Sequence, residues 1–252
     1  MYLPKTSDVM SKKPITATRE TPLKTLVSLM AEKSVGSIII EDHSTPIGIV
    51  TERELLKELA TYREIRANLK AGDVMSKTLV KLSPDTNIEE AAKTMISEKG
   101  RLVVVKGDKL VGVVTASDLV RGFSESEKDA PLPEDVVSSR IITLSEENTV
   151  YDAINVMHDN RVGSIIVTKG DKPAGIFTER DLITKVLSRK GLDTKLGVVQ
   201  SKPLITAKDS ATLREAAEKM RTNKIKRLPL MKRDKLVGIV TARDLVEAST
   251  RI

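Results

Sequence analysis

The sequence predicts an α/β (α+β) fold made of four tandem copies of one β-α-β-β-α unit. Three markers recur in the same order at a nearly constant period, which is the signature of a repeat protein. The first marker is Gly-apolar-apolar-Thr, whose threonines lie 64, 63 and 63 residues apart: Thr51, Thr115, Thr178 and Thr241. The second is an upstream methionine: Met30, Met95, Met157 and Met220. The third is a short motif further upstream: Asp8-Val9-Met10, Asp73-Val74-Met75, Asp135-Val136-Val137 and Gly197-Val198-Val199.

Each unit can be divided into elements by its pattern. A short extended stretch, such as 14–16 or 203–206, precedes a helix. Thr21-Pro22 predicts proline at the first helical position, and Thr86 with Glu89 predicts a capping box. On the buried face of this helix an alanine precedes the methionine by four residues, as in Ala91 and Met95, so the methionines are predicted to be core. Two apolar strands about a turn follow, and then a second helix, for example from Thr178 to Leu187.

One stretch, from Gly122 to Glu134, lacks this periodicity and contains two prolines. It follows the second repeat and therefore divides the chain into two modules of two repeats. Pairing is expected because one small unit would leave apolar faces exposed. The expected boundaries are 1–62 and 66–123 for the first two repeats, 124–134 for a linker, and 135–190 and 195–250 for the last two.

Composition excludes several classes of protein. The 252 residues carry a net charge of +7, with 40% hydrophobic and 31% charged residues, which is typical of a globular chain. With no cysteine and two histidines, disulfides and His- or Cys-based metal cages are excluded, and no metal site is expected. No apolar run approaches the ~20 residues that cross a bilayer, and the N-terminus lacks a signal-peptide pattern, so a cytoplasmic location without membrane contact is expected. Absent cysteine, a single glutamine and abundant charge suggest a thermophilic source.

An acid follows each repeated threonine by three residues: Glu54, Asp118, Asp181 and Asp244. Thr-x-x-Asp/Glu at the start of a helix is a capping box, which would explain both residues without a ligand. The same helix N-terminus could hold a phosphate through free amides and the threonine hydroxyl. A carboxylate one turn into the helix could accept both hydroxyls of a ribose. Three of the four copies use the shorter aspartate, which favours ribose binding.

These four units resemble CBS domains (cystathionine-beta-synthase repeats) paired into two Bateman modules, similar in layout to the gamma subunit of AMP-activated protein kinase. The resemblance covers nearly the whole chain. It implies a non-catalytic regulatory or energy-sensing protein that binds AMP, ADP or ATP and acts through a separate effector protein. S-adenosylmethionine is another ligand found in the family, although arginines at the predicted phosphate positions would repel its sulfonium.

The resemblance also implies roles for particular residues. Ribose would bind Asp118, Asp181 and Asp244, and phosphate would approach Thr115, Thr178 and Thr241. Two arginines match a phosphate position and would act across the pseudo-twofold of a module, Arg227 at the Asp181 site and Arg101 at the Glu54 site. With few aromatic residues, adenine would lie between aliphatic side chains, for which the candidates are Ile15, Val80, Ile142 and Ile205; strand core is the alternative role for these.

The four sites are expected to differ in affinity. The Asp181 site combines Thr178, Arg180 and Arg227 and is expected to be the strongest. The first repeat departs from the pattern, since the longer Glu54 beside Thr51 would push its carboxylate into the ribose space. That site is expected to be the weakest or empty.

Two other classes of function have less support in the sequence. An enzyme is not expected, because the chain has no Ser/His/Asp set, P-loop or Gly-x-Gly-x-x-Gly motif. Nucleic-acid binding is suggested by the positive charge, but the basic residues are interleaved with acids and no helix-turn-helix or zinc-finger signature is present. A steep salt dependence of duplex DNA binding would support it. A homodimer is left open by the sequence.

Overall fold

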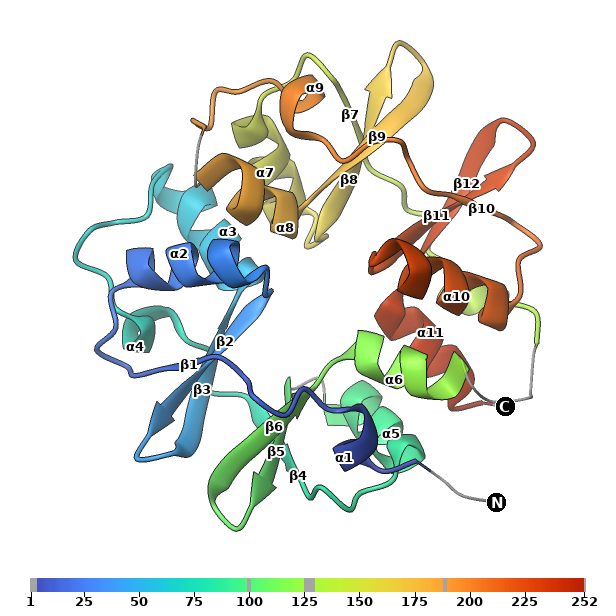
Figure 1. Cartoon of the computed structure of the whole chain (residues 1–252). Helices are drawn as coiled ribbons and strands as arrows, with labels where there is room; N and C mark the ends of the chain where they lie inside the picture. Colours follow the sequence, from blue (N-terminus) through green and yellow to red (C-terminus); the bar gives the residue numbers. More distant parts are fainter. Residues whose placement is uncertain (1–3, 99–100, 125–129, 188–189, 252) are drawn as a thin grey trace. The chain divides into compact units, whose positions relative to one another are not determined.

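The computed structural model describes residues 4–98, 101–124, 130–187 and 190–251 (Figure 1). The β-α-β-β-α order predicted from the sequence is confirmed in all four repeats, and a short additional helix precedes the first strand of each. The elements of repeat 1 are α1 (Thr6–Val9), β1 (Thr16–Ala17), α2 (Leu23–Lys33), β2 (Ser37–Asp42), β3 (Thr45–Thr51) and α3 (Glu52–Tyr62). Those of repeat 2 are α4 (Ala71–Val74), β4 (Leu79–Leu82), α5 (Ile88–Glu98), β5 (Arg101–Lys106), β6 (Lys109–Val114) and α6 (Ala116–Ser124).

Repeats 3 and 4 follow the same plan with one departure. The elements of repeat 3 are the 3-10 helix η1 (Glu134–Val136), β7 (Thr143–Ser145), α7 (Val150–Asp159), β8 (Ser164–Lys169), β9 (Lys172–Thr178), α8 (Glu179–Asp181) and η2 (Leu182–Leu187). Those of repeat 4 are α9 (Leu196–Val199), β10 (Ala207–Lys208), α10 (Leu213–Asn223), β11 (Arg227–Lys232), β12 (Lys235–Thr241) and α11 (Ala242–Ser249). The departure is η2, which has π geometry where the other repeats continue an α-helix.

Each repeat forms its own three-stranded sheet, in which the first strand runs parallel to the second and the second forms an antiparallel hairpin with the third. In Figure 1 the four hairpins are β2–β3, β5–β6, β8–β9 and β11–β12. The third strand of each sheet ends at the repeated threonine or one residue before it, and the second helix starts there. The helix N-terminus therefore lies at the carboxyl end of a strand in every repeat, as the sequence predicts.

Consecutive repeats exchange their leader segments, defined here as residues 5–11, 70–76, 134–138 and 195–201. Ser11 in the leader of repeat 1 exchanges two backbone hydrogen bonds with Val113 of repeat 2, at 3.0 and 3.2 Å. Ser201 in the leader of repeat 4 does the same with Ile176 of repeat 3, at 2.8 and 3.0 Å. The other two pairs are Ser76 with Ile49 and Ser138 with Ile239. This exchange pairs repeat 1 with repeat 2 and repeat 3 with repeat 4, which gives two modules.

The leaders explain why the repeated tetrapeptide begins with glycine. A Cβ at Gly175 would lie 2.8 Å from the backbone carbonyl oxygen of Ser201, and one at Gly112 would lie 3.1 Å from that of Ser11. Glycine is needed at these positions because the leader of the neighbouring repeat packs directly on the strand.

The chain contains two compact units, and each groups alternate repeats. We call Ile15–Lys77 with Ile142–Leu204 the odd unit, and Met1–Pro14, Thr78–Ile141 and Ile205–Ile252 the even unit. In the odd unit α3 packs against α7, and α2 against η2; in the even unit α6 packs against α10 and α11. The linker predicted from the sequence does not indicate this grouping. The grouping depends on which helix faces pack together and not on the order of the repeats along the chain.

Each unit has its own apolar core. The four repeated methionines are buried, as predicted: Met30, Met95, Met157 and Met220. The alanines one turn before them, such as Ala91 and Ala153, are completely buried and allow close helix packing. Phe177 in the odd unit is likewise fully buried.

Three local predictions were wrong by a residue or more. Pro22 is the N-cap of α2 and not its first helical residue. Helix α5 is capped by Asn87, whose Oδ1 accepts a 2.8 Å bond from the amide of Glu90, and Thr86 lies outside the helix. Asparagine is preferred over threonine at the N-cap, so Asn87 caps the helix and the adjacent Thr86 does not. The stretch 203–206 is not a strand, since β10 covers Ala207–Lys208. Residues 125–129 of the expected linker lie outside the described residues.

Candidate functional site

The four acids that follow the repeated threonines all close capping boxes. The backbone amide of the threonine donates to the carboxylate at 2.8 Å for Glu54, 2.8 Å for Asp118, 2.9 Å for Asp181 and 2.7 Å for Asp244. One carboxylate oxygen is thus committed to the cap in every repeat. The four sites differ in what the second oxygen contacts.

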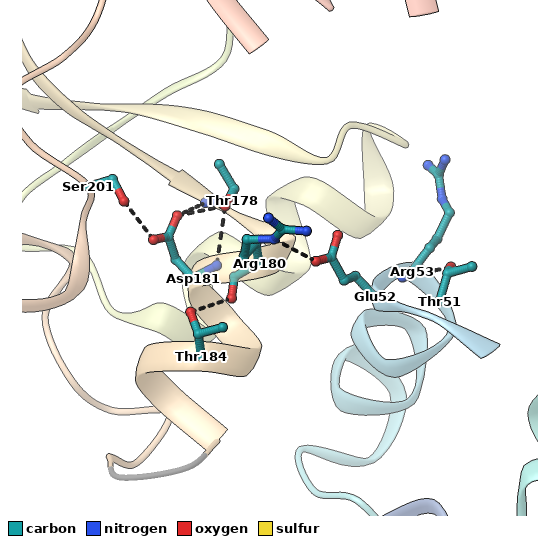
Figure 2. Close-up of polar contacts among 8 residues, drawn as sticks. All are labelled: Thr51, Glu52, Arg53, Thr178, Arg180, Asp181, Thr184 and Ser201. Carbon is teal, nitrogen blue, oxygen red and sulfur yellow. Dashed lines mark hydrogen bonds and ion pairs between the residues drawn. The ribbon is translucent and has the colours of Figure 1, made fainter. Parts of the chain in front are cut away.

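In repeat 3 the second oxygen of Asp181 is fully engaged (Figure 2). Its Oδ2 accepts from the amide of Thr178 at 2.9 Å and from the hydroxyl of Thr178 at 2.6 Å. Its Oδ1 accepts from the hydroxyl of Ser201 at 2.7 Å and lies 2.7 Å from Nζ of Lys185. The residue is only 4% exposed. Both oxygens of the carboxylate that was expected to bind ribose therefore have protein partners.

In repeat 2 the second oxygen is engaged by a single, more exposed group. Oδ2 of Asp118 accepts from the amide and the hydroxyl of Thr115, at 2.8 and 2.6 Å. Oδ1 accepts from Nη2 of Arg121 at 3.1 Å, and the same nitrogen donates to the carbonyl of Val9 at 2.8 Å. The Arg121 side chain is 51% exposed, so solvent screens this pair.

In repeat 4 the second oxygen is open. Oδ2 of Asp244 accepts from the amide of Thr241, and in the part of the chain that the structure describes nothing donates to Oδ1. Burial raises the pKa of Asp244, and nearby Glu247 adds to the rise, while the bonds from Thr241 and the charge of Arg243 oppose it. A carboxylate that is partly desolvated and has an open oxygen can accept a hydrogen bond from a hydroxyl group of a ligand.

In repeat 1 the longer side chain of Glu54 makes the same cap. Its Oε2 accepts from the amide and the hydroxyl of Thr51, and no described residue donates to Oε1. The glutamate folds back onto its threonine, so the cap tolerates the extra methylene. The expectation that this site is the weakest stays a prediction.

Arg180, expected beside the phosphate of the Asp181 site, pairs within the odd unit. Its Nε lies 3.4 Å from Oε1 of Glu52 on α3 (Figure 2). The corresponding residue of repeat 1, Arg53, donates from Nη2 to the carbonyl of Arg161 at 2.8 Å. In the even unit Arg243 donates to the carbonyl of Met95 at 2.9 Å. Each of these arginines therefore links its own repeat to the other repeat of the same unit.

The two arginines expected to reach phosphate lie at the first residues of β5 and β11. Arg101 is exposed and Arg227 is half-buried. Both belong to the even unit, whereas Glu54 and Asp181 belong to the odd unit. Their action across a module therefore stays a prediction.

The aliphatic residues expected to flank adenine are all half-buried and pack against the cores. Ile15 and Ile142 border the core of the odd unit, and Val80 and Ile205 border that of the even unit. The carbonyls of Ile15 and Ile142 also accept backbone bonds from the adjacent strands, at 3.1 and 2.9 Å. Strand packing is thus at least part of their role.

Sequence reasoning missed three residues of the Asp181 site: Lys185, Ser201 and Glu52. A signal for Ser201 was present, because serine recurs at this position in all four leaders: Ser11, Ser76, Ser138 and Ser201. Lys185 stands four residues after Asp181, a spacing that allows contact on a helix. Glu52 comes from another repeat, and nothing in its local sequence indicates Arg180 as its partner.

Within the described ranges no helix is long and apolar enough to cross a membrane. Those ranges also contain no group of three or more His, Cys, Asp or Glu side chains arranged to hold a metal ion.

Comparison with known proteins identifies the family. The CBS domain matches four times, at residues 7–61, 71–125, 134–188 and 197–251. The matches cover most of the chain, which therefore belongs to the CBS-domain family, with its four repeats arranged as two Bateman modules.

Solved structures share the whole fold. Protein MJ1225 of Methanocaldococcus jannaschii, described as a candidate archaeal homologue of g-AMPK, has a TM-score of 0.82 and 19% identity, with 97% of this chain and 99% of that chain covered. A conserved protein from Pyrococcus horikoshii has a TM-score of 0.67 and 20% identity, with the same coverage. At these identities the likeness shows the fold alone.

Curated relatives include archaeal proteins, among them an enzyme. A 33.4 kDa protein of the ribosomal RNA operon of Thermofilum pendens is 28% identical over 68% of this chain and 61% of its own length. MJ1404 of M. jannaschii is 25% identical over 95% of this chain and 60% of its own length. The chain thus spans about three-fifths of these two relatives. The inosine-5'-monophosphate dehydrogenase of M. jannaschii is 29% identical over 69% of this chain and 34% of the enzyme.

Proposed function

We propose that the protein is a non-catalytic regulatory sensor that binds an adenine nucleotide (AMP, ADP or ATP) and acts through a separate protein. The observation that carries the proposal is the open carboxylate oxygen of Asp244, partly desolvated at the start of α11 beside Thr241. A carboxylate in this state can accept a hydrogen bond from a ribose hydroxyl, and the N-terminus of the helix favours binding of the negatively charged phosphate.

Membership of the CBS-domain family supports a regulatory role, as does the fold shared with MJ1225, the candidate archaeal homologue of g-AMPK. The match to a dehydrogenase covers 34% of that enzyme, so its activity is not carried over to this chain. We expect the effector to be a separate chain, the location to be cytoplasmic and the source thermophilic. Dimerisation with a second copy is compatible with this function.

The geometry changes the expected order of affinity. The sequence predicts the tightest nucleotide binding at Asp181, because Thr178, Arg180 and Arg227 are expected beside it. In the structure Asp181 is held by Lys185 and Ser201, whereas Asp244 is open. We therefore propose that repeat 4 binds nucleotide more tightly than repeat 3.

Calorimetry of the ligand-free protein against AMP, ADP, ATP and S-adenosylmethionine tests the proposed function. We expect heats with at least one adenine nucleotide and weaker binding of S-adenosylmethionine. The matched controls are Asp244→Asn, which keeps the shape and removes the charge, and guanosine monophosphate, which tests the base. The absence of binding by all four ligands would reject the proposal.

A further inference from the structure

Lys185 makes three contacts that join the acid of repeat 3 to the leader of repeat 4. Its Nζ lies 2.7 Å from Oδ1 of Asp181 and donates to the hydroxyl of Ser201 at 2.8 Å and to the carbonyl of Val199 at 3.1 Å. Ser201 in turn donates to Oδ1 of Asp181 at 2.7 Å. The ammonium and the hydroxyl thus occupy Oδ1, the carboxylate oxygen that the cap leaves available to a ligand.

The helix that carries Lys185 has a geometry seen in no other described helix of the protein. Immediately after Asp181 it widens into the π-helix η2, whereas α3, α6 and α11 continue as α-helices. Thr184 within it bonds back to the carbonyl of Arg180 at 2.9 Å (Figure 2). A π-turn inside an α-helix is rare and is frequently found at functional sites. Here the wide turn carries the lysine that contacts Asp181.

The other repeats have no cation at the position of Lys185. The residue four places after the acid is Glu58 in repeat 1, Gly122 in repeat 2 and Ala248 in repeat 4. In the described residues, a lysine four places after the acid and a widened helix occur together in repeat 3. In repeat 2 the similar contacts to Oδ1 of Asp118 and to the leader carbonyl of Val9 come from Arg121, which stands three places after the acid on the α-helix α6. What distinguishes repeat 3 is the combination of the π-helix, the lysine and the Ser201 hydroxyl on a carboxylate that is only 4% exposed.

We propose that Lys185 is an internal competitor for the ribose-binding carboxylate of repeat 3, and that ligand binding there releases the leader of repeat 4. The inference rests on the proposed function, because it needs a ligand whose hydroxyl groups bind Asp181. Such a ligand must displace the ammonium and the Ser201 hydroxyl from Oδ1. Displacement also breaks the bond from Lys185 to Val199, so occupancy of repeat 3 is transmitted to the segment 195–201.

The test uses adenosine, which has the ribose and the base but no phosphate, so that loss of a lysine charge does not itself weaken binding. Binding to the full chain is followed by methyl NMR at Ile142 for repeat 3 and at Ile205 for repeat 4. We expect Lys185→Met to tighten adenosine binding in repeat 3 at least tenfold and to leave repeat 4 unchanged. Lys185→Arg should restore the weak binding of the wild type. Lys190→Met, which removes the same charge from an exposed site, is the matched control.

A second readout follows the leader. Amide hydrogen exchange at residues 196–201 should become faster in the wild type on adding adenosine, and should already be fast in ligand-free Lys185→Met. If Lys185→Met melts early, Ser201→Ala gives an independent route to the same result, since it also removes a partner from Oδ1 of Asp181. It should tighten adenosine binding in repeat 3 by a smaller factor.

The outcomes separate the two hypotheses. If neither adenosine nor AMP shifts the methyl signals of any repeat, the proposed function fails. If adenosine binds repeat 4 but Lys185→Met and Ser201→Ala leave repeat 3 unchanged or weaker, the competitor role of Lys185 is rejected while the sensor function stands.

Discussion

Repeats 3 and 4 carry the same motif, Thr-x-Arg-Asp, where the third strand ends and the second helix begins. The aspartate of the motif has different partners in the two repeats. In repeat 3 the carboxylate of Asp181 has four donors, from Thr178, Ser201 and Lys185. In repeat 4 the carboxylate of Asp244 keeps its cap, and its second oxygen is open among the described residues. The difference teaches that a shared motif fixes the cap, while neighbours outside it decide whether the acid is available to a ligand.

The largest expected effect is on stability and compares the two acids directly. Asp181→Ala should lower the free energy of unfolding by about 3 kcal/mol, because Lys185 and Ser201 lose their common partner. This value is the lower end of the range for breaking a buried ion pair, since the Lys185 side chain is 38% exposed. Asp244→Ala should cost about 1 kcal/mol or less, the loss of one cap, offset by relief of a desolvated charge. Differential scanning calorimetry of both variants measures this. Equal costs would mean that the contacts of Asp181 add nothing beyond its cap.

The second comparison is of nucleotide affinity. Asp244→Ala should remove the tightest binding phase, since a bond to a charged group contributes about 1.5–3 kcal/mol, or roughly tenfold or more in affinity. Asp181→Ala should leave that phase intact. Titration calorimetry with AMP checks both variants. If Asp181→Ala removes the tightest phase, the order expected from the sequence is right and the one from the geometry is wrong.

The third prediction concerns pH at Asp244. Its pKa is raised in the folded protein by burial, so the folded state binds protons more readily than the unfolded state there. The charged carboxylate therefore lowers the free energy of unfolding at neutral pH. This destabilisation decreases as the pH falls through the raised pKa of the folded state, and it is absent below the ordinary pKa of an aspartate in the unfolded state. Asp244→Asn should therefore raise the melting temperature at pH 7 and have less effect at acid pH. Nucleotide binding in repeat 4 should weaken as the pH is lowered, at a higher pH than for an ordinary aspartate.

The smallest effect is expected in repeat 2, which is intermediate between the two. Arg121→Met frees Oδ1 of Asp118, but the pair it breaks is half exposed and separated by 3.1 Å. Such pairs contribute about 0–1 kcal/mol. Adenosine affinity in repeat 2 should thus rise less than fivefold, measured by methyl NMR at Val80. A gain as large as that of Lys185→Met in repeat 3 would show that exposure does not matter to the competition.

Much of the fold and part of the site could be predicted from the sequence. Four repeats, their β-α-β-β-α order and the buried Met30 and Met157 follow from period and spacing, because each repeat forms its own local elements. The capping boxes of Asp181 and Asp244 also follow, since both partners lie within one helical turn. Where two good caps stood side by side, as at Thr86 and Asn87, the pattern could not decide between them.

The tertiary structure alone decided which repeats share a compact unit and which acids are already occupied. Packing of α3 with α7 and of α6 with α11 depends on complementary helix faces, which chain order does not encode. Ser201 reaches Asp181 only because the leader of repeat 4 crosses to the sheet of repeat 3. Lys185 is close in sequence, but its contact with both groups depends on the widened turn of η2. The sequence determined the chemical groups at each site, because composition and spacing are local; their availability depends on contacts between segments far apart in the chain.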